Sequence, residues 1–175
     1  MKSLSLRAKS LWAKKSIEGK WLPLVVHMAD SAEVARKLWE LWLSDGVKQA
    51  IAMLFGGEES FRDLFIFLAA VHDLGKATPV FQVKRSLNIE LDKWLGEYIM
   101  KTGLPLKPLS FFSHASKTPH ALATQILLED AGCNRNIAII LGAHHGKPPD
   151  NNMLLNAGIN TYTENYHLGK EGREA

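Results

Sequence analysis

Apolar residues recur every three or four positions along much of the chain. Between Leu24 and Leu43 the recurring positions are Met28, Ala32, Ala35, Trp39 and Trp42. This spacing places them on one face, so the stretch predicts an amphipathic helix with a buried face. Similar patterns predict the other helices. They are Val47–Phe55, a helix that starts near Glu58 and ends at His72-Asp73, a short helix from Thr78-Pro79, Ile89–Met100, a helix from Thr118-Pro119 to Gly132, and a run that ends at His144-His145.

Two of these stretches are apolar on every side just before they end. Leu64–Val71 leads into His72-Asp73, and Ile137–Ala143 leads into His144-His145. Helices that are apolar all round are typically buried. We therefore expect ionisable side chains at the C-terminal ends of two buried central helices. Gly75 fits the position just past a helix end, where the backbone is often left-handed.

The remaining stretches carry weaker patterns. Residues 1–20 are polar and basic, and we expect an extended lead-in anchored by Trp12 and Trp21. Residues 103–117 predict a long loop, after which Thr118 should cap a helix that has Pro119 at its first position. No stretch alternates cleanly enough to predict a strand. The expected fold class is therefore all-α, a compact helical bundle with a metal site at the ends of its buried central helices.

Composition narrows the class of protein. A chain of 175 residues, 46% hydrophobic and with five tryptophans, is long enough for one compact domain. We expect that domain to span residues 1–150, incomplete at its C-terminal end, and 151–175 to be a polar loop or disordered. The net charge of +3 permits an anionic substrate without requiring one. The single cysteine, Cys133, excludes an internal disulfide, and no apolar run reaches the ~20 residues of a membrane span. We expect a cytoplasmic protein with no membrane partner.

A carboxylate at the mouth of a buried helix requires a positive partner, because an unpaired buried charge costs several kcal/mol. For Asp73 that partner is Lys76, an arginine or a metal ion. Imidazole and carboxylate together are ligands of transition metals rather than of magnesium. The candidate metal ligands of the chain share these side-chain types. They are His27, His72, Asp73, His114, His120, His144 and His145. His114 falls in the predicted loop and is the weakest candidate.

Asp73 is the natural bridge of such a cluster. A carboxylate has two oxygens and can hold two cations about 3.5–4 Å apart, the spacing found in two-metal hydrolases. Two ions held in this way generate hydroxide near neutral pH and neutralise the developing charge on a phosphate. The residues therefore predict hydrolysis of a phosphoester.

At this point the sequence resembles a known family. The doublet His72-Asp73 is the signature of the HD superfamily of metal-dependent phosphohydrolases. The whole chain resembles the HD nuclease domain of the CRISPR-associated helicase–nuclease of type I systems, which implies an HD-domain helical bundle. The matching segments, in order, are Leu11-Trp12-Ala13-Lys14, His27 with Asp30, Val71-His72-Asp73-Leu74-Gly75-Lys76, Phe81-Gln82, His120-Ala121-Leu122 and Gly142-Ala143-His144-His145-Gly146.

The resemblance implies a site and a function. One metal would be held by His27, His72, Asp73 and a later aspartate, and the other by Asp73, His120, His144 and His145. Asp73 and Lys76 would be the catalytic residues, with Lys76 facing the scissile phosphate. The cofactors would be one or two divalent ions, with Mn, Co, Ni or Fe expected before Mg. The family cuts single-stranded DNA, which an attached helicase supplies, and an RNA-guided CRISPR surveillance complex recruits it for antiviral defence.

Two departures from the family keep alternatives open. No aspartate follows Asp150, so the late metal ligand is absent. No G-x-x-x-x-G-K-[ST] phosphate loop occurs, so the chain resembles a truncated N-terminal piece without the helicase. One alternative is a cyclic-dinucleotide or nucleotide phosphohydrolase of the same superfamily, although Gly-Lys-Pro-Pro after His145 does not match the cyclic-dinucleotide class. The other is a non-catalytic truncated module that docks a partner.

Overall fold

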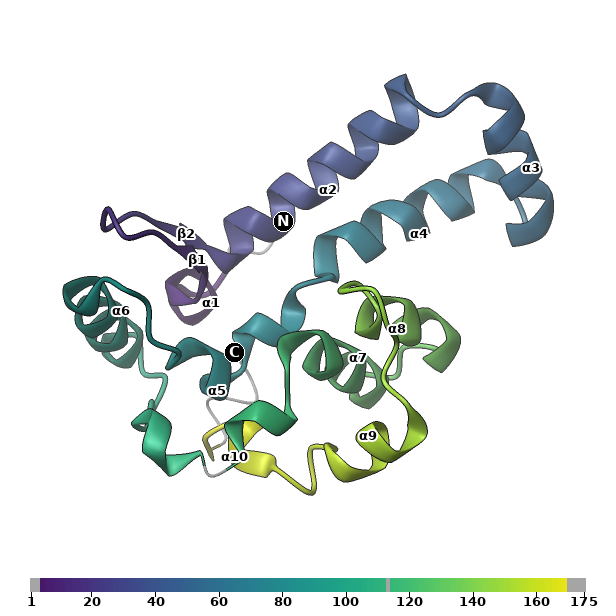
Figure 1. Ribbon diagram of the computed structural model, residues 1–175. Coiled ribbons are helices and arrows are strands. Elements are labelled where there is room, and N and C mark those ends of the chain that lie inside the picture. Colours follow the sequence, from purple (N-terminus) through teal and green to yellow (C-terminus); the bar gives the residue numbers. More distant parts are fainter. Residues whose placement is uncertain (1–3, 113, 170–175) are drawn as a thin grey trace.

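Helices dominate the computed structural model, which describes residues 4–112 and 114–169 (Figure 1). The expected all-α class is confirmed. The elements in chain order are α1 (Leu6–Ser10), β1 (Trp12–Lys15), β2 (Trp21–Pro23), α2 (Leu24–Leu41), α3 (Asp45–Phe55), α4 (Glu58–Val71), the 3-10 turn η1 (Leu74–Ala77), α5 (Pro79–Gln82), α6 (Ile89–Lys101), η2 (Leu109–Phe111), η3 (Ala115–Lys117), α7 (His120–Asp130), α8 (Arg135–Gly142), α9 (Asn151–Asn156) and α10 (Thr163–Tyr166).

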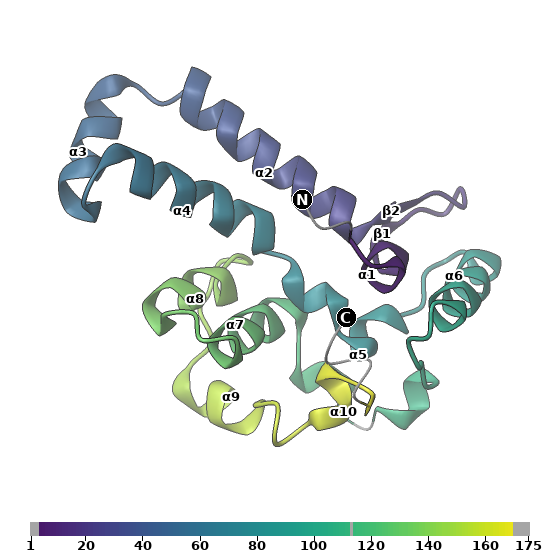
Figure 2. The same ribbon diagram turned by 180° about the vertical axis from the view of Figure 1, so that it is seen from behind.

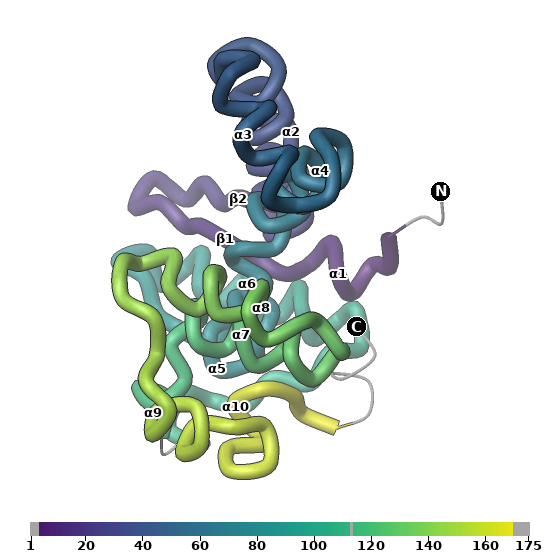
Figure 3. The backbone as a smooth tube through the Cα atoms, turned by 90° about the vertical axis from the view of Figure 1, so that its right-hand side faces the viewer, coloured from purple at the N-terminus to yellow at the C-terminus, as the bar shows by residue number. Residues whose placement is uncertain are grey.

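Helices α2, α3 and α4 form an arm. α2 and α4 lie side by side, and α3 joins their outer ends (Figures 1 and 2). Trp39 holds the pair together, because its buried ring packs against Phe61 and Phe65 with centroids 5.8 and 6.1 Å apart. Trp42, predicted to lie on the same buried face, is 77% exposed, as is neighbouring Leu41 at 80%, so the end of α2 is not covered. The outer half of the arm projects away from the other helices (Figure 3).

The prediction that α4 and α8 are buried on every side is wrong. No residue of α4 is fully buried, and Phe67 is 41% exposed. Only the C-terminal end of α4 packs against the α7–α8 pair, where Leu68 and Val71 contact the apolar cluster around Leu141. The helix that is buried on all sides is α7, in which every position from Ala121 to Ile126 is buried.

The N-terminal segment forms a small hairpin, although no strand was expected. β1 and β2 pair antiparallel, with Trp12 opposite Pro23 and an irregular register between Trp12 and Lys14. This irregularity buries Trp12 and Ala13 in succession, so the sequence lacks the alternation that predicts a strand. Gln82 fixes the hairpin on α5: Trp12 N–H donates to Gln82 Oε1 (3.1 Å), and Gln82 Nε2 donates to Trp12 O (2.9 Å).

The segment after Asp150, expected to be loop or disordered, forms the short helices α9 and α10. Asp150 caps α9 by accepting from Met153 N at 2.8 Å. Tyr166 packs with Leu122 and Ile126 of α7, so α10 covers that helix. The segment is anchored by a few scattered apolar residues, among them Ala157, Tyr166 and Leu168, whose spacing shows no helical period. The predicted domain boundary at residue 150 stays a prediction.

Asn165 also explains why Thr118 does not cap α7 as predicted. Buried Asn165 donates through Nδ2 to Thr118 Oγ1 at 2.9 Å and to His114 O at 3.2 Å. The N-cap residue of α7 is Pro119, one position later, and it has no side-chain cap. The Thr118 hydroxyl thus serves the contact between α10 and the start of α7.

No helix in the described part of the chain combines the length and apolar character that crossing a membrane requires.

Candidate metal centre

Four helix ends converge on one point of the fold (Figure 1). α2 contributes its first turns, α4 and α8 their C-terminal ends, and α7 its first residue. The six residues that the resemblance assigns to the two metals all lie there. They are His27 of α2, His72 and Asp73 directly after α4, His120 at the start of α7, and His144 and His145 directly after α8. The carbonyl ends of α4 and α8 carry partial negative charge, which favours a cation between them.

A close contact between η1 and α7 brings these ends together. A Cβ on Gly75 would lie 2.0 Å from the carbonyl oxygen of His120, so only glycine fits. Gly75 N–H donates to Thr124 Oγ1 at 2.8 Å, and Thr124 has no exposed surface. The left-handed conformation predicted for Gly75 is wrong, because its φ is not positive. The glycine is required for the close approach of two backbones.

Asp73 lies between two groups of histidines, and each carboxylate oxygen faces one group. Oδ2 is 2.8 Å from His27 Nε2 and 3.2 Å from His72 Nε2. Oδ1 is 3.2 Å from His120 Nε2 and 3.5 Å from His144 Nε2. The geometry therefore has the form expected of a bridging carboxylate.

The protonation state of Asp73 follows from these contacts. The side chain is 6% exposed, and burial alone would raise its pKa. Hydrogen bonds from His120, Lys76 and His27 outweigh the burial and hold the pKa of Asp73 well below its usual range. Asp73 is therefore a permanent anion, as a metal-bridging ligand must be.

Two histidines have a tautomer that suits metal binding. His72 Nδ1 lies 2.8 Å from the carbonyl oxygen of Ala69, and His144 Nδ1 lies 2.6 Å from that of Leu141. A carbonyl can only accept, so each Nδ1 carries a proton, and in the neutral form of the ring the lone pair is on Nε2. A hydrogen bond at the other ring nitrogen is the usual support of a metal-ligating histidine.

The lone pair of His144 has no partner in the described part of the chain. Its Nε2 atom is buried and accepts no hydrogen bond, while Asp73 Oδ1 faces it at 3.5 Å. Burial lowers the pKa of His144, with the neighbouring His145 and His120 adding to the effect, so the ring stays neutral. The neutral imidazole nitrogen and the carboxylate oxygen both direct lone pairs at each other, and a cation between them would stabilise this arrangement. This observation fits a divalent metal ion at the site.

The second group of ligands is completed by His145, whose Nε2 lies 2.8 Å from His120 Nε2. The ligand atoms of His120, His144 and His145 all lie within 4.8 Å of one another, as do those of His27, His72 and Asp73. The cluster can therefore offer two positions to metal ions, one on each side of the carboxylate.

Lys76 meets Asp73 directly, with Nζ 2.7 Å from Oδ2 and a side chain that is 11% exposed. Its backbone is held by Gln82, whose Nε2 donates to Lys76 O at 2.6 Å. Phe81 forms a wall of the site, because its ring centre lies 5.7 Å from Lys76 Nζ and 5.5 Å from the ring of His120. Sequence reasoning gave Phe81 and Gln82 no role, although both belong to the segments that matched the resembled family.

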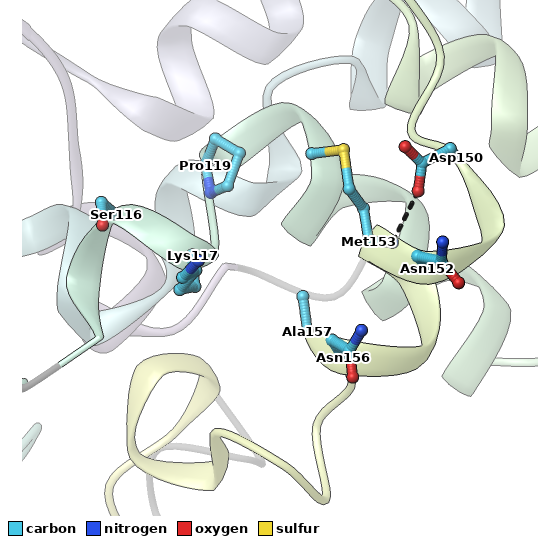
Figure 4. Close-up of a pocket in the computed structure, with 8 residues that line it drawn as sticks. All are labelled: Ser116, Lys117, Pro119, Asp150, Asn152, Met153, Asn156 and Ala157. Atoms are coloured by element: carbon cyan, nitrogen blue, oxygen red, sulfur yellow. Dashed lines mark hydrogen bonds between the residues drawn. The ribbon is translucent and has the colours of Figure 1, made fainter.

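Three other residues, Asp30, His114 and Asp150, lie away from this centre. Asp30 is exposed on α2, and His114 is exposed and packs its ring against Tyr162, with centroids 5.1 Å apart. Asp150 lines a separate cavity of about 410 Å³ between α9 and the start of α7, where its hydrogen bond to Met153 is visible (Figure 4). Within the described residues, Asp73 is thus the only carboxylate in either ligand group.

A helical bundle with a His-Asp doublet at a helix end, surrounded by further histidines, defines a domain of the HD class. The family model described as "Cas3, HD domain" matches residues 12–174, and the chain belongs to this family.

The relatives are much longer proteins. The chain is 37% identical over 165 residues to the CRISPR-associated nuclease/helicase Cas3 of Streptococcus thermophilus, covering 89% of this chain and 18% of the relative. It is 33% identical over 178 residues to the CRISPR-associated endonuclease/helicase Cas3 of Thermus thermophilus, covering 98% of this chain and 18% of the relative. A solved structure titled "Crystal structure of CRISPR-associated protein" superposes with a TM-score of 0.76 at 26% identity, over 95% of this chain and 18% of that one. The chain spans less than a fifth of these proteins.

Proposed function

We propose that this chain is the metal-dependent nuclease domain of CRISPR interference and hydrolyses phosphodiester bonds of single-stranded DNA. The carrying observation is the Asp73 carboxylate, which has one oxygen toward each group of imidazoles. The names of the relatives support the reaction, since both are called nuclease and helicase proteins. Under this proposal the chain works in the cytoplasm with a helicase portion and an RNA-guided surveillance complex.

The proposed ligand sets follow the two sides of the carboxylate. His27, His72 and Asp73 would hold one divalent ion. Asp73 and the group His120, His144 and His145 would hold the other. Because imidazoles make up most of both sets, Mn, Co, Ni or Fe should fit better than Mg. Ions bound there would lower the pKa of a bound water and neutralise charge on the phosphate.

The protein residues around the ions have separate tasks. The Nδ1 hydrogen bonds of His72 and His144 to backbone carbonyls fix both rings with Nε2 toward Asp73. Lys76 holds a positive charge beside the carboxylate, where it can bind a phosphate oxygen of the substrate. Phe81 covers one side of His120 and limits access of water from that side.

The decisive test is cleavage of circular single-stranded DNA by metal-stripped protein to which Mn²⁺ is returned. Asp73→Ala should abolish cleavage while the circular dichroism spectrum stays helical, because the change removes the shared ligand rather than a packing group. Asp30→Ala is the matched control, since Asp30 is exposed on α2 and should be dispensable. Cleavage by Asp73→Ala at the wild-type rate would refute the proposal. Turnover of cyclic dinucleotides without DNA cleavage would favour the other phosphohydrolase class.

The two metal positions should differ in affinity. One side of Asp73 has three imidazoles, whereas the side of His27 and His72 has two and lacks a further carboxylate in the described chain. Anomalous scattering from crystals soaked in Mn²⁺ should therefore give a strong peak on the His120 side and a weak one on the His27 side. Two peaks of equal occupancy, or a single peak beside His27, would contradict the ligand assignment.

A further inference from the structure

A groove of about 560 Å³ lies between β1, the segment that follows α5, one side of α6 and the loop before η2. Its charged lining is strongly basic. The cations are Lys15, Lys84, Arg85, Lys93 and Lys107, and Asp92 is the one acid among the lining residues. Such an excess of one charge in a concave surface attracts an anionic ligand.

The acid in the groove is already neutralised. Lys15 Nζ lies 2.6 Å from Asp92 Oδ1, and Ser86 donates to the same carboxylate through both its backbone N–H and its hydroxyl. The side chains of Lys15 and Asp92 are 5% and 16% exposed, so this ion pair is structural. Within the described residues, the other four cations of the groove have no carboxylate partner. Their charge is available to a ligand.

Lys84 of the groove and two residues of the metal centre, Lys76 and His120, contact the same aromatic ring, that of buried Phe81. Lys84 Nζ lies 4.8 Å from the ring centre of Phe81, and Lys76 Nζ lies 5.7 Å from the same centre. The rings of Trp12 and His120 also contact Phe81, with centroids 4.7 and 5.5 Å away. Partial burial and the charge of Lys76 lower the pKa of Lys84. An anion beside Lys84 and Lys76 would favour the charged form of Lys84 and so raise its pKa again.

Apolar side chains accompany the cations along the groove. Ile89, Met100 and Leu109 are 75%, 50% and 38% exposed and belong to its lining. A single nucleic-acid strand presents phosphates at regular intervals next to uncovered base faces. The cations and the apolar surface therefore fit the two parts of one ligand.

We infer that this groove binds the backbone of single-stranded DNA and leads the strand past Lys84 and Phe81 to the Asp73 centre. The inference rests on the proposed nuclease function and adds the path by which the substrate arrives. Lys84 is the phosphate contact nearest the reaction, and Lys93 and Lys107 hold the strand farther out. These lysines position the strand and are not catalytic.

The test measures binding without chemistry. A fluorescein-labelled single-stranded 15-mer is titrated with the 175-residue chain in EDTA, and anisotropy is recorded from 50 to 200 mM salt. Each phosphate contact of a single strand adds about 0.7 to the slope of log affinity against log salt. The triple variant Lys84→Ala/Lys93→Ala/Lys107→Ala should therefore lower the slope by about 2 and weaken binding about a hundredfold at 0.1 M salt.

Two matched triple variants serve as controls. The first removes the same charge from the arm and is Lys37→Ala/Lys48→Ala/Arg62→Ala. It should lower the salt slope by no more than half as much as the groove variant does. Changing the three groove lysines to arginine should preserve binding. An unchanged slope in the groove variant, an equal loss in the arm variant, or a loss in the arginine variant would overturn the inference. Equal competition by duplex DNA of the same length would overturn the single-strand assignment.

A small substrate separates this inference from the proposed function. Bis(p-nitrophenyl) phosphate contains a phosphodiester but is too short to occupy the groove. With Mn²⁺, the groove variant should hydrolyse it at the wild-type rate while cleavage of the 15-mer falls at least tenfold. If wild type hydrolyses neither substrate, the proposed function is wrong. The titration in EDTA would then still show whether the groove binds single-stranded DNA. Parallel loss of both activities in the groove variant would contradict a role limited to positioning.

Discussion

Replacing Gly75 by alanine should disrupt the centre without touching any ligand. The added Cβ would lie 2.0 Å from the His120 carbonyl oxygen and 2.7 Å from Thr124 N, whereas ordinary contacts begin near 3.4 Å. Both obstacles are backbone atoms of a buried helix, so they cannot rotate away. The η1 backbone would have to move by more than about 1 Å relative to α7, which also breaks the hydrogen bond from Gly75 N–H to Thr124 Oγ1.

The magnitude follows from these two effects. Overpacking of a tight interior costs about 1–3 kcal/mol, and a lost buried hydrogen bond adds about 1 kcal/mol. We expect the free energy of unfolding, measured by urea denaturation, to fall by about 3 kcal/mol. Because Asp73 precedes η1 and His120 begins α7, the same movement separates the two ligand groups. A displacement of about 1 Å costs on the order of a hundredfold in rate.

The matched control is Gly96→Ala in the interior of α6, where nothing lies within 4 Å of the added Cβ. Alanine is the better helix residue, so this variant should be more stable by up to about 1 kcal/mol. Mn²⁺ binding measured by calorimetry should be weakened in Gly75→Ala and unchanged in Gly96→Ala. Wild-type stability and wild-type Mn²⁺ affinity in Gly75→Ala would refute the argument that backbone contact positions the ligands.

Three further predictions concern the metal and the packing around it. In metal-stripped protein, Mn²⁺, Co²⁺ or Ni²⁺ should restore cleavage of single-stranded DNA better than Mg²⁺, and equal rates with Mg²⁺ would argue against an imidazole-rich site. Gln82→Ala should lower the free energy of unfolding by about 2–4 kcal/mol, because it leaves the buried N–H and carbonyl of Trp12 unpaired; urea denaturation with no change would contradict this. Hydrogen bonds from Lys15 and Ser86 outweigh burial and lower the pKa of Asp92 in the folded state. The ionised carboxylate therefore stabilises the fold above the unfolded pKa of about 3.9, and this stabilisation is lost as the pH falls through the lower, folded pKa. The stability difference between wild type and Asp92→Asn should therefore shrink between pH 6 and pH 3, and a constant difference would count against the ion pair.

The clustering of most candidate ligands at helix ends was predictable, because it follows from the local sequence. His72-Asp73 and His144-His145 each follow an apolar run that ends in a helix terminus, and the structure places both pairs at such termini. His27 had no signal of its own beyond its position in an amphipathic helix. His27 became a candidate metal ligand only because other histidines occur in similar positions and because the sequence resembles a known family.

What the sequence did not reveal depends on contacts between distant segments. Gly75 looked like a helix-ending glycine because the carbonyl that excludes a side chain there belongs to His120, 45 positions later. Gln82 looked like an ordinary polar residue, yet its amide pairs with the backbone of Trp12. The apolar run of α4 predicted full burial, whereas the arm leaves most of that helix with only α2 and α3 as neighbours. Periodicity reports which side of an element is apolar, not how many neighbours cover it.

The single carboxylate between two groups of imidazoles has a consequence for cooperativity. Asp73 Oδ2 faces residues of α2 and of the end of α4, and Oδ1 faces residues at the start of α7 and just after α8. Under the proposed ligand assignment, the first ion to bind takes up much of the only negative charge that the second ion could use. The two binding steps would therefore be anticooperative even if the imidazole sets were identical. Binding of an ion on one side of Asp73 would lower the affinity of the other side through this one side chain, with no movement of the helices.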